Sequence, residues 1–219
     1  MNSKLVFSIS ILLGCIILGS FYVVQVNKQR FIEKQQQISL QEKIEENQAK
    51  TRDDFSDYIY ALNEIVGAKN IAMQDLKQTY DAIEKYGNAV KGGAVYSNVI
   101  ISQYKEINTK YQLAKNKLDT IENLEMKNAI FDLIQALTLY LEVNEETIKF
   151  YQHLHRVYIL NEKDDYQGGN KPNVNTAYSL LENSFVKMDK IILDSIGNFL
   201  DDQNKERYQN YKTIILSAN

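Results

Sequence analysis

Apolar side chains recur every three or four positions through most of this chain of 219 residues. Such spacing places them along one face of an α-helix, and a helix with an apolar stripe must bury that stripe against another helix. No stretch with the alternating pattern of a β-strand competes with these stripes. The sequence therefore predicts an all-α fold.

The apolar stripes fall into four series that follow a polar region. Gly87, Gly92 and Gly93 interrupt the pattern between the first two series, and residues 161–175, which hold the only proline, interrupt it before the last. The expected helices are residues 54–86, 95–123, 127–160 and 175–216.

The break between the second and third helices contains neither Gly nor Pro, and it is inferred from the phase of the stripe. The apolar positions shift there by two residues, a rotation of about 200° around a helix, so one straight helix would face opposite ways in its two halves. We expect a tight turn near residues 123–128. Short connections join antiparallel neighbours, and the prediction for residues 54–219 is an up-and-down antiparallel four-helix bundle.

The longest uncharged apolar run is LVFSISILLGCIILGSFYVVQV, residues 5–26. At a helical rise its 22 residues extend about 33 Å, enough for a bilayer core of about 30 Å. We expect a transmembrane anchor at 5–26 after a short tail at 1–4. Residues 27–53 lack Gly and Pro and are rich in helix-forming polar residues, which predicts a helical stalk.

The segment Leu12-Leu13-Gly14-Cys15 resembles the lipobox of bacterial lipoproteins. The resemblance implies acylation of Cys15, which would become the new N-terminus. Because the apolar run continues well past Cys15, through Val24, an uncleaved anchor is the favoured interpretation, and a lipoprotein anchored at Cys15 is the alternative.

The orientation of such an anchor depends on the charges that flank it. A short tail with one basic residue, Lys4, is typical of an export signal and favours a C-terminal domain outside the cytoplasmic membrane of a bacterium, periplasmic or extracellular. A literal count favours the opposite, because Lys28, Arg30, Lys34 and Lys43 follow the run. A cytoplasmic C-terminal domain therefore stays an alternative.

Composition argues against several classes of function. With 25 basic and 28 acidic residues the net charge is -3, so no nucleic-acid partner is expected. A single cysteine excludes an intrachain disulfide and a thiolate metal site, and His153 and His155 point to different helix faces. No phosphate loop or nucleophile elbow occurs. We expect no catalytic residues, metal or cofactor, and a protein that is not an enzyme.

Two Gly-containing loops, residues 87–94 and 161–175, would meet at the end of the bundle farthest from the membrane. Binding residues concentrate on loops held by a rigid scaffold. The candidate partner-binding residues are Lys85, Tyr86, Lys91, Tyr96, Asp164, Asp165, Tyr166 and Lys171. The alternative is that they are ordinary solvated turn residues.

Polar residues also stand on the apolar stripes. Lys69 and Asn144 would either fix the register of the helices or mark a cavity for a small anion or amino acid. Tyrosines on the stripes need partners for their hydroxyls, so they either line a polar ligand cavity or lie at bundle edges; they are Tyr80, Tyr104, Tyr111, Tyr151 and Tyr158.

An anchored helical bundle of this size looks like the ligand-binding ectodomains of bacterial chemoreceptors and sensor kinases, at the level of fold. The leading hypothesis is a non-enzymatic, membrane-anchored binding or adaptor protein of a bacterial envelope. It would contact the lipid bilayer through residues 5–26 and a protein partner or ligand through its membrane-distal loops. The alternatives are an immunity or inhibitor protein against a secreted toxin, and a coiled-coil spacer or assembly protein that forms a homo-oligomer.

Overall fold

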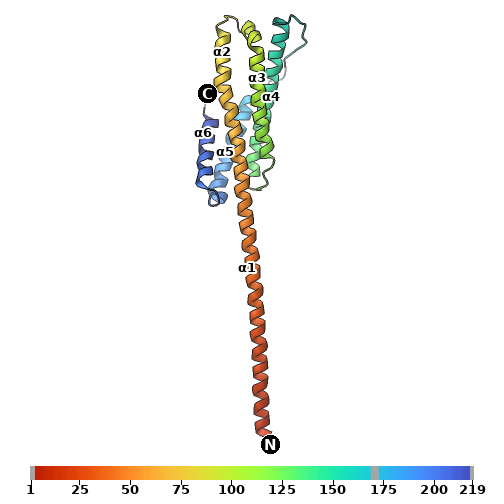
Figure 1. The fold of residues 1–219 in the computed structure, drawn as a ribbon, viewed down its shortest axis with the longest axis vertical. Helices are drawn as coiled ribbons and strands as arrows, with labels where there is room; N and C mark the ends of the chain where they lie inside the picture. The colour runs from red at the N-terminus through yellow and green to blue at the C-terminus, as the bar shows by residue number, and fades with distance from the viewer. Residues whose placement is uncertain (1–2, 169–172, 218–219) are drawn as a thin grey trace. The chain divides into compact units, whose positions relative to one another are not determined.

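The structure is a computed structural model that describes the backbone of residues 3–168 and 173–217, with the side chains from residue 25 onward in those ranges. Every regular element within these residues is helical (Figure 1). The prediction of an all-α fold is confirmed for this part of the chain.

The helical elements follow one another along the chain. They are α1 (Ser3–Ile71), the π-helical segment η1 (Ala72–Leu76), α2 (Lys77–Glu84), α3 (Ala89–Leu118), α4 (Lys127–Tyr158), α5 (Val174–Ile191), the π-helical segment η2 (Ile192–Ile196) and α6 (Asp202–Leu216). The chain divides into two units, residues 1–49 and residues 50–219.

The first unit belongs to α1, and its described side chains are mostly exposed to solvent. The large apolar residues Phe31, Ile38 and Leu40 are each about 60% exposed. The predicted anchor at 5–26 and the predicted lipidation residue Cys15 lie, apart from residues 25 and 26, outside the described side chains. Among the residues whose side chains the structure describes, no helix is both long and apolar enough for a membrane span.

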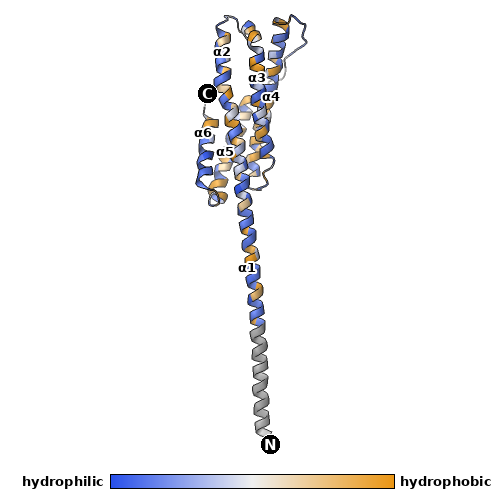
Figure 2. Ribbon diagram, in the orientation of Figure 1, coloured by the Kyte–Doolittle hydropathy of each residue, from blue (hydrophilic) through white to orange (hydrophobic). Residues whose placement is uncertain are grey.

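The main core of the second unit joins the end of α1 to α3, α4, α5 and α6. Its largest fully buried side chains include Phe55, Tyr58, Leu133, Phe185 and Tyr208. The ring centroids of Tyr208 lie about 6 Å from those of Phe55, Tyr58 and Phe185, so α6 is packed into the aromatic centre of this core. Figure 2 shows apolar and polar residues alternating around these helices, as the stripes of the sequence predict.

A second, smaller core lies among η1, α2, α3 and the last turns of α4. Its buried members include Leu76, Ile83, Ile100, Tyr151 and Leu154. Tyr104 is partly buried and packs against them. The helices that line the candidate site pack against one another through this smaller core.

The second helix begins earlier than the sequence analysis predicts. The turn covers only residues 85–88, and α3 starts at Ala89 because the Asn88 side chain accepts hydrogen bonds from the amides of Val90 and Lys91, at 3.0 and 3.1 Å. Gly92 and Gly93 are therefore inside a helix and not in a loop. A Cβ at Gly92 would lie 2.7 Å from Ile83 Cγ2 and 2.8 Å from the Ile83 carbonyl oxygen, so this glycine permits close helix contact.

The single helix expected over residues 175–216 is two helices in the structure. After η2 the chain turns at residues 197–201, and Asp201 caps α6 by accepting a hydrogen bond from the Asn204 amide at 2.7 Å. Glycine is required at position 197, because a Cβ there would lie 2.3 Å from the carbonyl oxygen of Ile192. The described residues thus form five helical rods, and the prediction of four was wrong in this respect. The break before α4 spans residues 119–126, beside the turn expected at 123–128.

Both polar residues on the apolar stripes have partners. Asn144 is buried, and its side-chain amide donates to Asn108 Oδ1 at 2.8 Å between α4 and α3. Lys69 Nζ donates to the carbonyls of Ile214, Ile215 and Ser217 at 2.9, 3.1 and 2.6 Å. The ammonium therefore caps the carboxyl end of α6, where the helix dipole favours a cation. A cavity of about 560 Å³ adjoins Lys69, but the lysine's hydrogen bonds go to α6.

Candidate functional site

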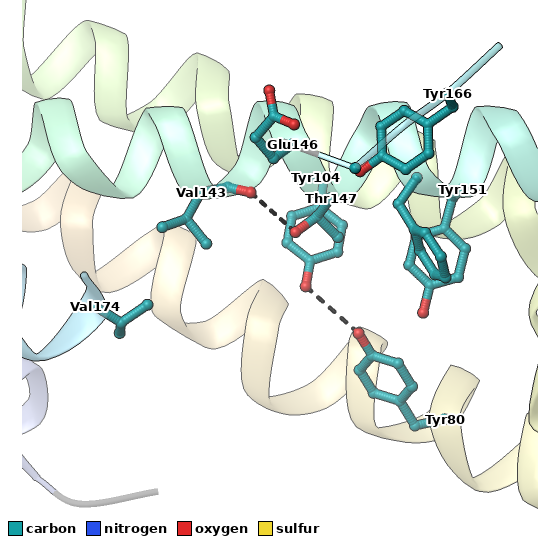
Figure 3. A pocket seen from close by; sticks show the side chains of 10 residues that line it. Tyr80, Tyr104, Val143, Glu146, Thr147, Tyr151, Tyr166 and Val174 are labelled. Carbon is teal, nitrogen blue, oxygen red and sulfur yellow. Dashed lines mark hydrogen bonds between the residues drawn. The ribbon is translucent and has the colours of Figure 1, made fainter. Parts of the chain in front are cut away.

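The cavity that we take as the candidate site lies between α2, α3 and α4, beside the α4–α5 connection and the first residue of α5. Its volume is about 570 Å³, within the range of small-molecule sites. The lining residues are Tyr80, Tyr104, Val143, Glu146, Thr147, Phe150, Tyr151, Tyr166, Gly168 and Val174. Figure 3 shows the side chains of Tyr104, Tyr151 and Tyr166 gathered beside Glu146 and Thr147, with Tyr80 entering from another helix.

One face of α4 provides half of this lining. Val143, Glu146, Thr147, Phe150 and Tyr151 are spaced by three, one, three and one residues, which puts them on one side of a helix. The Thr147 hydroxyl donates to the Val143 carbonyl at 2.9 Å. The α4 face therefore forms a continuous wall with one carboxylate.

The opposite wall consists of tyrosines from α2 and α3. The hydroxyls of Tyr80 and Tyr104 lie 3.4 Å apart and form a weak hydrogen bond. Burial, and secondarily the neighbouring Tyr80, raises the pKa of Tyr104. Burial and Tyr80 likewise raise the pKa of Tyr151. Both side chains are therefore neutral phenols at physiological pH.

The α4–α5 connection closes the cavity through Tyr166. The Tyr166 ring lies between two α4 side chains, with centroids 6.4 Å from Phe150 and 5.4 Å from His153. The Asp164 carboxylate accepts a hydrogen bond from the Tyr166 amide at 3.1 Å. It also lies 3.7 Å from His153 Nδ1 and 3.8 Å from the Arg156 guanidinium. These contacts hold the connection against the last turns of α4.

The carboxylate of Glu146 is the charged group of the cavity wall. Lys149, one turn further along α4, donates to Glu146 Oε1 at 2.6 Å. This hydrogen bond is the main cause of the raised pKa of Lys149. The Lys149 side chain is 54% exposed, so the ion pair stands at the rim of the cavity.

The structure brings together only some of the predicted partner-binding residues. Asp164 and Tyr166 meet at the cavity, and Tyr166 lines it. Asp165 is exposed, and Lys171 lies outside the described residues.

The other four candidates lie at the turn between α2 and α3 and are not part of the cavity lining. Lys85 follows the last residue of α2, Lys91 is in the first turn of α3, and Tyr96 is further along α3. The rings of Tyr86 and Tyr96 meet edge to face with centroids 6.4 Å apart. This pair is a local contact across the turn.

Sequence reasoning placed Tyr80, Tyr104 and Tyr151 on apolar stripes and left open whether they line a cavity; the structure shows that they do. Glu146 was missed, because a carboxylate on a helix resembles any solvated residue in sequence. His155, in contrast, is half-buried, and its Nδ1 lies 2.9 Å from the Ser97 hydroxyl. The described side chains contain no group of three or more His, Cys, Asp or Glu residues able to hold a metal ion.

Comparison of the chain with protein-family models, with curated proteins and with solved structures finds no match in any of the three.

Proposed function

We propose that this chain is a non-enzymatic, membrane-anchored binding protein of a bacterial envelope, and that its ligand occupies the tyrosine-lined cavity. In this proposal residues 5–26 are the anchor, residues 27–53 a helical stalk and residues 54–219 an antiparallel bundle that contains the cavity. The uncharged apolar run supports the anchor, and the short basic tail before it supports export.

The observation that carries the proposal is the composition of the cavity wall. Five of its ten lining residues are aromatic, and they come from three helices and one connection. Ligand sites in proteins have this character: a largely apolar and aromatic concave surface with few polar groups that orient the ligand. The tyrosine hydroxyls and the Glu146 carboxylate are the orienting groups here.

The cavity is tested with indole, a neutral aromatic probe, by following the ring resonances of Tyr104 and Tyr151 by NMR. Indole should shift both resonances in a saturable way. Thr147→Trp fills the cavity and should abolish the shifts. The matched control is Thr213→Trp at an exposed position of α6. The Thr213 hydroxyl donates to the Gln209 carbonyl at 2.8 Å, as the Thr147 hydroxyl donates to the Val143 carbonyl at 2.9 Å, so both substitutions remove the same kind of hydrogen bond.

Saturable shifts that survive Thr147→Trp, or an absence of shifts with folded protein, would refute a cavity site. The anchor is tested separately with reporters fused after Asn219. Activity of a periplasmic reporter supports export, and activity of a cytoplasmic reporter alone would contradict it.

A further inference from the structure

We propose that the ligand of the tyrosine-lined cavity is a small organic cation, an ammonium group carried on an apolar body. This inference rests on the proposed function, because it names the chemical class of the ligand for the same site. It depends on three features of the wall: its charge, its aromatic surface and the ion pair at its rim.

The described part of the wall carries one carboxylate. Of the ten described residues that line the cavity, Glu146 is the one with an acidic side chain, and no Lys, Arg or His is among them. The hydroxyls of the partly buried Tyr104 and the buried Tyr151 stay protonated, because burial raises the pKa of both side chains. An anionic ligand would be desolvated beside a carboxylate, and the nearest cation, Lys149, is already paired with that carboxylate at the rim. A cationic ligand would gain the attraction of that carboxylate.

The aromatic surface favours the same charge. The face of a phenol or benzyl ring is negative, and it attracts ammonium groups, most strongly where water is excluded. Tyr80, Tyr104 and Tyr151 approach from α2, α3 and α4, and Tyr166 covers them from the α4–α5 connection. Rings from four segments can surround an alkylated ammonium. Such a group has few or no N–H donors for hydrogen bonds to a carboxylate, so the ring faces are suitable partners for it.

The ion pair at the rim shows which kind of group the carboxylate accepts. Glu146 Oε1 already accepts a hydrogen bond from the Lys149 ammonium at 2.6 Å. Lys149 is not a lining residue and its side chain is about half exposed, so it is a competitor that can leave the carboxylate at little cost. A bound cation would share the carboxylate or displace Lys149. Removal of Lys149 should therefore strengthen binding.

The experiment compares three molecules of nearly equal shape and different charge by NMR titration of the full chain. They are choline, its neutral carbon isostere 3,3-dimethyl-1-butanol, and the anion 3,3-dimethylbutanoate. Choline should shift the Tyr104 and Tyr151 ring resonances with a dissociation constant roughly tenfold lower than that of the alcohol. The anion should bind more weakly than the alcohol.

Two substitutions at the ion pair should have opposite effects. Glu146→Gln should bring choline binding down to the level of the alcohol, and Lys149→Met should tighten it several-fold, while the alcohol is unaffected by either. Glu145→Gln is the matched control, since Glu145 precedes Glu146 on α4 and faces a separate groove with Asn108 and Thr109. A merely structural role of the pair would change all three ligands alike.

The outcomes separate this inference from the proposed function. If the alcohol or the anion binds as tightly as choline, or if indole shifts the tyrosine resonances and choline does not, the cation class is refuted and the cavity site stands. If neither indole nor any of the three molecules shifts them, both the inference and the proposed function fail.

Discussion

Two adjacent glycines in α3 offer a sharp test of how its first turns pack. At Gly92 an added Cβ would lie 2.8 Å from the Ile83 carbonyl oxygen and 3.1 Å from Ile83 Cα, both backbone atoms. At Gly93 it would lie 3.2 Å from Leu154 Cδ1, the end of a flexible side chain, and 3.4 Å from Tyr151 Cε1. Gly92→Ala must displace the end of α2, whereas Gly93→Ala needs only a small side-chain adjustment.

The magnitudes follow from two opposing effects. Replacing a helical glycine with alanine contributes about 1 kcal/mol through backbone entropy. Overpacking against a rigid neighbour costs about 1–3 kcal/mol. Gly93→Ala should therefore leave the free energy of unfolding unchanged or raise it by up to about 1 kcal/mol. Gly92→Ala should lower it by up to about 2 kcal/mol.

The measurement is urea denaturation of the full chain followed by circular dichroism, with both variants under identical conditions. Because the propensity gain is common to both substitutions, the difference between the variants isolates the packing cost. Equal stability of the two variants would refute the close contact between Gly92 and Ile83.

Two further predictions concern the core and its pH dependence. Lys69→Met should lower the free energy of unfolding by about 1–2 kcal/mol, because a charge-assisted cap on α6 is lost at a partly exposed site. Amide hydrogen exchange should rise most in α6. The control is Lys105→Met at an exposed position of α3, and an effect of Lys69→Met no larger than that of the control would contradict the cap. Burial raises the pKa of several tyrosines above the usual 10.0, so their contribution to stability is complete below that pH and is lost as the pH rises through the folded-state values. The residues are Tyr58, Tyr104, Tyr111, Tyr151 and Tyr208. When the pH is raised, the tyrosinate absorbance of these residues should appear together with the loss of helical circular dichroism. Ionisation of all 15 tyrosines in a chain that is still folded would refute their burial.

The sequence predicts the helices well where an apolar stripe decides the structure and less well where a single residue does. The shift in phase near residue 123 marks a real break, because burying a stripe involves many side chains at once. Gly92 and Gly93 mislead because glycine has two uses, to end a helix or to let two helices approach. The cap at Asn88 was the signal that distinguishes them.

The turn at residues 197–201 was missed for a related reason. The apolar stripe continues from Phe199 through Tyr208 in sequence, although the chain reverses between them. Gly197 followed by Asp201 carries the information, since a glycine and then a capping residue is the usual order around a helix break. A stripe alone does not reveal that its two halves face one core from opposite directions.

The candidate site is predictable only in part. Tyr166 was expected as a contact residue because it stands on a long loop, and it does line the cavity. The tyrosines of α2, α3 and α4 stood out as polar groups on apolar stripes. That they face one another depends on the crossing of three helices, which no local pattern encodes. The role of Glu146 depends on the same crossing.

The wall formed by Tyr166 differs from the others in how freely it can change over evolutionary time. The rings of Tyr80, Tyr104 and Tyr151 stand on helices that pack against a shared core, so most substitutions near them affect folding. Tyr166 stands on the α4–α5 connection, which is held to α4 by a carboxylate and two ring contacts. Insertions and exchanges in a connection are tolerated far more readily than those in a core. Descendants of one ancestral chain could therefore acquire new ligands by altering this connection while keeping the same scaffold.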